Sequence, residues 1–400
     1  MDLRDTPEQA AYRGEVRAWI EAHRHEAPPP TRGNHSVDPE PYRRWQARLA
    51  EAGLVGVTWP EEYGGAGLGP VEQLIVRSEL RRAGCGGILD NIAVGIIGPT
   101  IIARGSSEQQ RRYLGPMLRG EEGWCQLFSE PAAGSDLAGV RTRARHTADG
   151  FSISGQKVWT TGAQHADFGL LLARTDPDVP KHKGLTMFLV PMRVPEVTVR
   201  PLRGMSGGAS FNEVFFDDVP VGDQAVLGSV SGGWGVALTA LMFERATLLG
   251  AFDEIGFSAE RFAAPFAEHR ELADAHLRQR LAQVTCGLLS LRYSSYRTLT
   301  ALSRGAVPGP EAALGKIGVI EAARQGCELI AELVGPDALE GDWGETAFNL
   351  PGLRSGGGTE EVLRNMVGER VLGLPPEPRT DKRTPFRELG RSPAGAGVPA

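Results

Sequence analysis

The stretch Trp124-Cys125-Gln126-Leu127-Phe128-Ser129-Glu130-Pro131-Ala132-Ala133-Gly134-Ser135-Asp136 decides how this chain of 400 residues is organised. Its first residues predict an apolar strand, and the residues after them predict a turn. In that turn Ser129, Gly134 and Ser135 offer hydroxyls and unhindered backbone N–H groups to a polar ligand. Helical spacing precedes the stretch and short β-rich runs follow it, so it marks the start of a β domain.

A second stretch, Gly155-Gln156-Lys157-Val158-Trp159-Thr160-Thr161-Gly162, follows further along the chain. It presents the large flat ring of Trp159 beside the hydroxyls of Thr160 and Thr161. A ring that lies against a planar heterocycle, with hydroxyls near the ring nitrogens, is what binding a flavin requires. The alternative interpretation is structural, with Trp159 as a core aromatic and with Ser129 and Thr161 as turn caps.

Hydrophobic periodicity divides the chain into three predicted domains and a tail. It predicts an N-terminal helical domain over residues 1–122, a middle β domain over 123–226 and a C-terminal four-helix-bundle domain over 227–374. Residues 375–400 are rich in proline and small residues, and they predict an extended, partly mobile tail. The expected fold class is α+β and multidomain, with a middle β-barrel or sandwich between the two helical domains.

The same patterns predict individual elements within these domains. Helices are expected over residues 7–22, 41–52, 71–83, 91–104, 106–118, 236–252, 276–304, 311–334 and 359–371. Strands are expected over residues 124–128, 140–146, 151–153, 169–173, 185–190 and 213–216.

Composition excludes several classes of protein. The chain is 41% hydrophobic and 23% charged, as soluble globular proteins are, and its net charge of −6 without a Lys/Arg run argues against a nucleic-acid partner. No stretch approaches the roughly 20 apolar residues of a membrane span, and the first residues lack a signal-peptide pattern, so we expect a cytoplasmic protein. The cysteines are scattered and the histidines form no ligand-spaced pair, so neither disulfides nor a metal are expected.

The two opening stretches, in this order, resemble the acyl-CoA dehydrogenase family. Further matches are Trp59-Pro60-Glu61-Glu62-Tyr63-Gly64-Gly65, Phe216-Asp217-Asp218-Val219-Pro220-Val221, Phe243-Glu244-Arg245, Gly358-Thr359-Glu360-Glu361 and Glu369-Arg370-Val371-Leu372-Gly373-Leu374-Pro375. So many ordered matches make chance a poor explanation. The resemblance implies FAD as cofactor, an acyl-CoA or acyl-carrier thioester as substrate, and an electron-transfer flavoprotein as electron acceptor. It also implies a homodimer, a homotetramer or a heterotetramer.

The reaction of this family needs a carboxylate base, usually the Glu of a Tyr-Glu-Gly-Thr sequence before the last helix. This chain has Gly356-Gly357-Gly358-Thr359 there. In one subgroup the base lies on the first helix of the C-terminal domain, just before an Arg, and this chain has Glu244-Arg245 there. The helical neighbours of Glu244 are mostly apolar, so burial should raise its pKa towards neutrality. The alternative for Glu244 is a structural ion pair with an arginine inside the bundle.

The resemblance assigns further site residues. Gln126, Leu127 and Ser129 would lie at the polar edge of the flavin, and Thr161 would lie at N5 beside Trp159 and Thr160. Ser135 matches a position that contacts the phosphates of the nucleotide or of CoA, and Thr359 and Glu361 match positions that contact the cofactor. Arg245 is expected to organise the site or contact the substrate, with a structural ion pair as the alternative.

Gly357 has a second expected role. Its backbone N–H would polarise the thioester carbonyl together with a ribityl hydroxyl of the flavin. Alternatively, Gly356 to Gly358 form only a loop that leads into a helix and leave room for a bulky acyl group.

Departures from the family pattern leave other functions open. The Arg-x-x-Phe-Gly segment is not recognisable between Gly256 and Asp274, and the usual Gln-x-x-Gly-Gly is replaced by Glu332-Leu333-Val334-Gly335-Pro336. We therefore weigh three hypotheses: a dehydrogenase that uses Glu244, an oxidase or monooxygenase on the same fold, and a non-catalytic subunit of a heteromeric complex.

Overall fold

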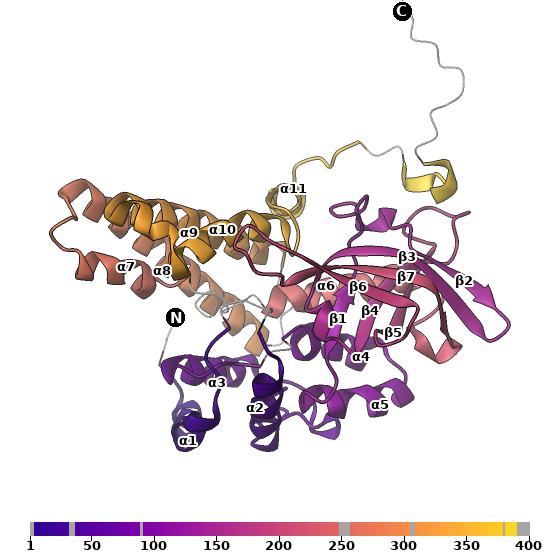
Figure 1. Cartoon of the computed structure of the whole chain (residues 1–400), viewed down its shortest axis with the longest axis horizontal. Coiled ribbons are helices and arrows are strands. Elements are labelled where there is room, and N and C mark those ends of the chain that lie inside the picture. The colour runs from indigo at the N-terminus through magenta and orange to yellow at the C-terminus, as the bar shows by residue number, and fades with distance from the viewer. Residues whose placement is uncertain are drawn as a thin grey trace, which may run out of the picture.

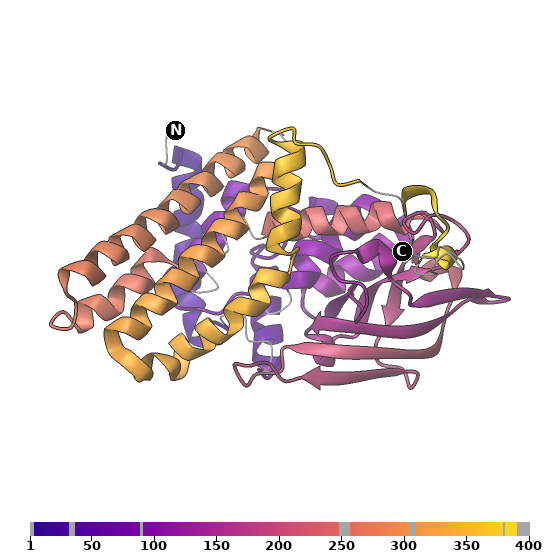
Figure 2. The same ribbon diagram turned by 90° about the horizontal axis from the view of Figure 1, so that it is seen from above.

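A computed structural model describes residues 4–31, 37–88, 91–247, 257–304, 309–378 and 381–389. N-terminal helices lie below a bundle of long helices in Figure 1, and a twisted sheet lies beside both. Figure 2 shows the same molecule from above, with helix α11 (Glu360–Arg370) at the border between the bundle and the sheet. The predicted fold class is confirmed.

The N-terminal helices follow the periodicity of the sequence. They are α1 (Pro7–His23), α2 (Glu40–Glu51), α3 (Pro70–Arg82), α4 (Gly98–Arg104) and α5 (Ser107–Leu118). The capping box of α1 is present, since the Gln9 N–H donates to Thr6 Oγ1 at 3.2 Å and the Thr6 N–H donates to Gln9 Oε1 at 3.1 Å. The predicted helix over 91–104 differs, because a π-helical turn at Ala93–Ile97 precedes α4. Such turns occur often at functional sites.

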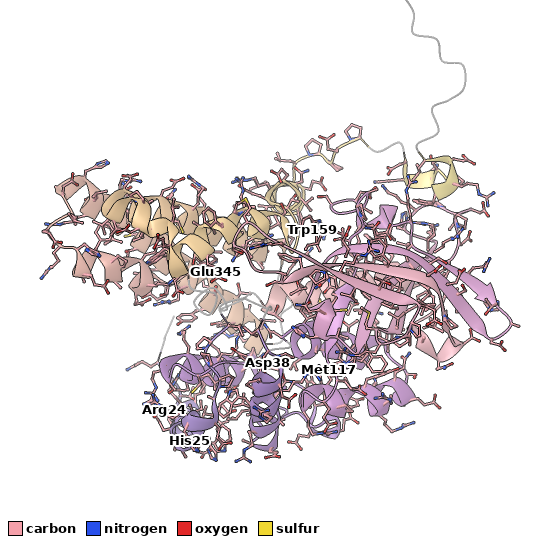
Figure 3. The ribbon with its side chains drawn as sticks, in the orientation of Figure 1. Arg24, His25, Asp38, Met117, Trp159 and Glu345 are labelled. Carbon is pink, nitrogen blue, oxygen red and sulfur yellow. The ribbon has the colours of Figure 1, made fainter. Side chains whose placement is uncertain are left out.

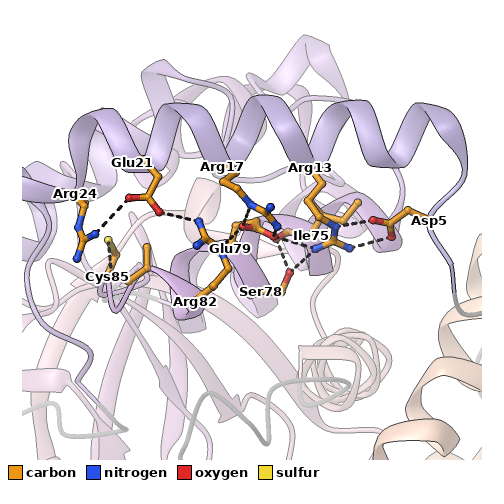
Figure 4. A network of polar contacts seen from close by, with 11 residues as sticks. Asp5, Arg13, Arg17, Glu21, Arg24, Ile75, Ser78, Glu79, Arg82 and Cys85 are labelled. Atoms are coloured by element: carbon orange, nitrogen blue, oxygen red, sulfur yellow. Dashed lines mark hydrogen bonds and ion pairs between the residues drawn. The ribbon is translucent and has the colours of Figure 1, made fainter.

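A network of charged side chains ties α1 to α3 (Figure 4). Glu79 of α3 is 2% exposed and accepts hydrogen bonds from Arg17 at 2.9 Å, from Arg82 at 2.7 Å and from Arg13 at 3.3 Å. These bonds, that of Arg17 foremost, lower the pKa of Glu79 to about 2. The pair of helices is therefore held together by a carboxylate that stays charged down to low pH.

The β domain is one sheet in the part of the chain that the structure describes. Its strands are β1 (Trp124–Leu127), β2 (Arg143–Thr147), β3 (Gly150–Thr161), β4 (Phe168–Arg174), β5 (Leu185–Pro191), β6 (Val197–Leu202), β7 (Phe211–Val221) and β8 (Val226–Leu227). They are ordered β6-β7-β3-β2-β4-β5-β8, and β1 pairs in parallel with β4. The six predicted strands are present, whereas β6 and β8 were not predicted. β6 is a half-exposed edge strand that contains Pro201, so its apolar pattern is weak.

Strand β4 shows why the sheet is the centre of the molecule. Leu170 and Leu172 pack into the core shared with the N-terminal helices, whereas Leu171 and Ala173 pack into the core on the other face. Successive side chains of a strand point to opposite faces, and a strand buried on both faces is therefore a continuous apolar run.

Helix α6 (Gly233–Thr247) lies in the central core and not in the bundle core. Its residues Val236, Ala237 and Ala240 share the core of the N-terminal helices and the sheet. The helix approaches β5 so closely that a Cβ at Gly233 would lie 2.5 Å from the Thr186 carbonyl carbon. The predicted continuation of this helix to residue 252 lies outside the described residues.

The bundle has its own core. It consists of α7 (Ala259–Glu268), α8 (Ala275–Ser303), α9 (Ala313–Val334) and α10 (Gly341–Ser355), and it packs around Phe262, which is fully buried. Helices α7 and α10 were not predicted. Both contain an internal proline, and α10 also holds several glycines, residues that disfavour helices. Within the described residues, every helix is too short or too polar to span a bilayer.

The tail differs from its prediction over residues 381–389, which we call the C-terminal strap. The strap docks on the loop between β4 and β5, where the N–H of Phe386 donates to the Val179 carbonyl at 2.9 Å. The Arg174 guanidinium lies 3.5 Å from the centre of the Phe386 ring, and Lys181 pairs with Asp381 at 2.6 Å. These contacts, between residues far apart in sequence, give the strap a fixed position.

Candidate active site

Trp159 is presented by a local distortion of β3. The pairing of β3 with β7 shifts register between Lys157 and Thr160, and Trp159 between them has φ of +59°. A bulky residue in this conformation costs about 1–3 kcal/mol and persists where the surroundings impose it, commonly at functional sites. Its side chain is 63% exposed, with the ring of Phe211 edge-on at 6.0 Å. Figure 3 places Trp159 where the sheet borders the C-terminal helices.

A buried ion pair supports the backbone on both sides of this site. Lys157 is fully buried, and its Nζ lies 2.8 Å from Glu130 Oε1 and 3.0 Å from the Phe128 carbonyl oxygen. Glu130 also accepts the N–H of Arg141 at 2.6 Å and the N–H of Thr142 at 2.9 Å. Burial lowers the pKa of Lys157 to about 8, against the opposing effect of Glu130.

This pair fixes the turn after β1 to the bulge of β3. The Val158 N–H donates to the Ser129 carbonyl at 2.9 Å, so Ser129 and Trp159 are held in one rigid unit. Sequence reasoning missed the pair. The sequence feature that could have indicated the pair is a charged residue in each of the two stretches quoted above, Glu130 in the first and Lys157 in the second.

The expected flavin residues fall into two groups. Gln126, Ser129 and Thr161 are partly exposed, and Ser135 is exposed on the turn. In contrast, Leu127 is fully buried in the β core and Thr160 is 1% exposed. Leu127 and Thr160 can therefore offer a ligand only their backbone groups.

These residues fit a flavin. An exposed flat ring, two partly exposed hydroxyl side chains and a turn held by the Lys157–Glu130 pair lie on one part of the sheet, and strained residues such as Trp159 cluster at functional sites. A cavity adjoins Thr161 between the N-terminal helices and the β domain, and its lining includes Ile92, Trp124 and Gly162.

Glu244 reaches this region from α6. Gln126 Nε2 donates to Glu244 Oε2 at 3.2 Å, which joins the helix to β1. Burial raises the pKa of Glu244, and the bond from Gln126 and the charges of Lys316 and Arg245 oppose that rise. Arg245 itself is exposed. Among the described residues, Glu244 makes no ion pair with an arginine.

The carboxylate of Glu244 lies against the glycine loop before α11. A Cβ placed on Gly357 would lie 3.1 Å from Glu244 Oε1. Gly357 and Gly358 have φ of +68° and +94°, a conformation in which a side chain is strained. The carboxylate of Glu244 therefore adjoins Gly357, the loop position that aligns with the glutamate of the usual family motif.

Around that loop, the other expected residues have distinct positions. Thr359 caps α11, since its Oγ1 accepts the N–H of Val362 at 3.3 Å, and Glu361 is exposed in the first turn of the helix. Lys316 of α9, which sequence reasoning missed, donates to the carbonyls of Gly356 and Gly358. The sequence feature that could have indicated Lys316 is that it is the one charged residue in Ala313–Val319, where all the other residues are apolar or small.

Comparison with known proteins gives family matches along most of the chain. The model "Acyl-CoA dehydrogenase, N-terminal domain" matches residues 6–121, the corresponding middle-domain model matches 125–219, and the C-terminal-domain model matches 231–372.

Two curated proteins of Mycobacterium tuberculosis are similar in sequence. Acyl-CoA dehydrogenase FadE34 is 38% identical over 337 residues, which are 84% of this chain and 47% of FadE34, so this chain spans about half the length of that relative. Acyl-CoA dehydrogenase IpdE1 is 37% identical over 348 residues, which are 84% of this chain and 89% of IpdE1.

Two solved structures are similar in fold. The "Tcur3481-Tcur3483 steroid ACAD" has a TM-score of 0.80 at 30% identity, and the match covers 94% of this chain and 100% of that one. The ChsE4-ChsE5 complex from Mycobacterium tuberculosis has a TM-score of 0.75 at 27% identity, with the same two coverages.

Proposed function

Since this chain belongs to the acyl-CoA dehydrogenase family and is an FAD-dependent enzyme, we propose that Glu244 is its catalytic base. In this proposal Glu244 takes the α-proton of an acyl-CoA or acyl-carrier thioester, and the product is the 2-enoyl thioester. The bound FAD supplies the acceptor for the β-hydride, at N5. The observation that carries the proposal is the distance of 3.1 Å from Glu244 Oε1 to a Cβ at Gly357, because it brings the carboxylate next to the position at which the usual base is attached to the chain.

The surroundings of Glu244 suit a base that works near neutral pH. Burial raises its pKa, and a proton acceptor is most effective when its pKa lies near the working pH. Gln126 donates to one carboxylate oxygen and leaves the other, Oε1, directed at the glycine loop. Glu244 is thus oriented by a neutral donor, which does not neutralise its charge.

Gly357 is proposed to bind the thioester oxygen through its N–H. Among the described residues no hydrogen bond uses this N–H, so it is available as a donor next to Glu244. A donor at the carbonyl acidifies the α-proton, since it stabilises the negative charge that develops on the oxygen. Arg245, exposed one residue beyond the base, is proposed as a contact for the substrate.

The cofactor site is proposed to consist of residues from the sheet and from the loop before α11. Trp159 would stack on the flavin while Gln126, Ser129 and Thr161 meet its polar atoms. Leu127 and Thr160 would contribute backbone groups only, since their side chains are buried. Ser135 is proposed to meet the phosphates of the nucleotide or of CoA, and Thr359 and Glu361 are proposed to approach the cofactor from α11.

A bulky acyl group is the proposed substrate class. The loop of Gly356 to Gly358 has no side chains, so nothing of its own fills the space beside Glu244. A similar solved structure is a steroid ACAD. The similar structures also include complexes of two different chains, and we propose a heterotetramer, with a homodimer or homotetramer as alternatives. An electron-transfer flavoprotein is the proposed acceptor of electrons.

Anaerobic titration with a panel of acyl-CoAs, from short chains to steroid side-chain thioesters, tests the function. We expect at least one thioester to bleach the bound flavin, and we expect Glu244→Gln to slow the bleaching by a factor of about a hundred or more. An unchanged rate in that variant removes Glu244 from the base role.

Two further outcomes of the purification and assay separate the alternatives. Steady peroxide production without an added acceptor indicates an oxidase or monooxygenase. A colourless protein that gains flavin only with a partner chain indicates a non-catalytic subunit.

A further inference from the structure

The glycine loop beside Glu244 does not define its own conformation. Gly356, Gly357 and Gly358 have no side chains, and glycine has the largest backbone freedom of all residues. A loop that must aim an N–H at a reacting carbonyl needs a fixed geometry. Something outside the loop therefore has to hold it.

Lys316 supplies that support from α9. Its Nζ donates to the Gly358 carbonyl oxygen at 2.5 Å and also to the Gly356 carbonyl oxygen. The two accepting carbonyls belong to the residues on either side of Gly357. The Gly356 carbonyl shares its peptide plane with the N–H of Gly357, so the first bond restrains the direction of that N–H. The second bond restrains the peptide plane between Gly358 and Thr359.

The same ammonium group lies next to the base. The position of a Cβ at Gly357 is 3.1 Å from Glu244 Oε1 and 3.9 Å from Lys316 Nζ, so both charged groups border one point. Lys316 is about half buried, and burial lowers its pKa while Glu244 opposes that change. In turn the charge of Lys316 opposes the rise in the pKa of Glu244.

Other charged residues near α6 do not duplicate this contact. Arg245 follows the base on α6 and acts on Glu244 through its charge. Arg77 of α3 donates to the Thr247 carbonyl at 3.3 Å, and Arg104 of α4 donates to Thr239 Oγ1 at 3.1 Å. These two arginines bind α6 on either side of Glu244, whereas Lys316 bonds to the loop itself.

We propose that Lys316 is a positioning residue for the reaction. It keeps the N–H of Gly357 and the carboxylate of Glu244 directed at the same thioester. The proposal rests on the function proposed above. It has two separable consequences. Without the bonds of Lys316 the loop moves freely, and without its charge Glu244 gains a proton at a higher pH.

Three variants of the holoenzyme test this role. Lys316→Met removes the bonds and the charge, Lys316→Arg keeps a charge and donors of similar reach, and Arg324→Met removes a charge from the exposed face of the same helix, where Arg324 pairs with Glu321 and Glu328. Two measurements need no substrate. Amide hydrogen exchange across residues 352–362 measures how mobile the glycine loop is. Infrared spectroscopy over a range of pH follows the band of the protonated carboxyl group and so gives the titration midpoint of Glu244. The variant Glu244→Gln identifies that band.

In Lys316→Met we expect faster exchange in the loop and a titration midpoint of Glu244 that is higher by about one pH unit. At pH values well below the titration midpoint of the parent protein its kcat should fall roughly tenfold, because one unit changes the ionised fraction of the base about tenfold there. Lys316→Arg should keep most of the parental exchange rate, titration midpoint and kcat, and Arg324→Met should match the parent protein in all three.

A Lys316→Met protein whose loop exchanges at the parental rate, or whose carboxyl titrates at the parental pH, overturns the proposal. Failure of the function itself has a different signature. In that case the parent protein is not bleached by any thioester, while the exchange and infrared measurements still decide the role of Lys316.

Discussion

Lys157 Nζ and Glu130 Oε1 lie 2.8 Å apart inside the β domain, with their side chains 0% and 5% exposed. The ion pair joins the turn after β1 to the bulge that presents Trp159. Two charges are expensive to bury, so their presence under the proposed flavin site indicates a role in fixing its geometry.

Lys157→Met should destabilise the protein by about 3–5 kcal/mol, because it leaves Glu130 as an unpaired buried charge. Urea unfolding measures the loss, and the FAD content after purification should fall with it. The double variant Lys157→Met/Glu130→Gln should recover much of the stability without recovering the FAD content. Lys183→Met on the exposed β4–β5 loop is the matched control and should resemble the parent. Full FAD content in both Lys157 variants would contradict a positioning role for the pair.

Transfer of the base between α6 and the loop tests whether the two positions are equivalent. Glu244→Gly should abolish bleaching of the flavin by acyl-CoA, and the double variant Glu244→Gly/Gly357→Glu should restore part of it. Gly357→Glu alone should be poorly active and less stable, since its φ of +68° disfavours a side chain and its carboxylate would meet Glu244. Stopped-flow absorbance measures all three. A double variant as inactive as Glu244→Gly would show that the positions are not interchangeable.

Trp159→Ala should weaken FAD binding by about tenfold, because it removes the ring expected to stack on the flavin. Fluorescence titration of the apoprotein with FAD gives the Kd. Thermal stability of the apoprotein should hardly change, since the side chain is 63% exposed. Tyr293→Ala on α8, an exposed aromatic residue on the bundle, serves as the control. An unaltered Kd in Trp159→Ala would remove the tryptophan from the cofactor site.

The Glu79 network makes the N-terminal helices sensitive to acid. The pKa of Glu79 is about 2 in the folded protein and ordinarily 4.5, so the network stabilises the fold fully above pH 4.5 and loses this effect as pH falls towards 2. The stabilisation is about 3 kcal/mol at neutral pH, since each pKa unit corresponds to about 1.4 kcal/mol. Unfolding of Glu79→Gln, measured from pH 7 to pH 3, should show lower stability at pH 7 and a smaller loss in acid. Glu15→Gln, exposed on α1, should follow the parent.

Local signals in the sequence were enough for most of the fold. Helical spacing over residues 7–22 predicted α1, and the β-rich run over residues 169–173 predicted β4. Glu244 was singled out because its neighbours at helical spacing are apolar, and the structure finds it shielded, with a raised pKa.

Contacts between distant residues could not be predicted in this way. Lys316 meets Gly356 across 40 positions, and Phe386 meets Arg174 only after the chain has crossed the bundle. Periodicity reports which face of an element is buried but not which partner covers it. The side chains of Leu127 and Thr160 illustrate the same limit, since the family resemblance gave their place in the site but not their burial.

The C-terminal strap has a consequence for how the molecule is assembled. The chain leaves the β domain after α6, forms α7 to α11, and then contacts the β domain again at Val179 and Lys181 of the loop between β4 and β5. In topological terms the helices from α7 onwards are a cassette inserted into the β domain, anchored at both ends. The strap thus gives these helices a second attachment to the β domain besides the chain itself at α6, and this attachment limits how far the two can separate.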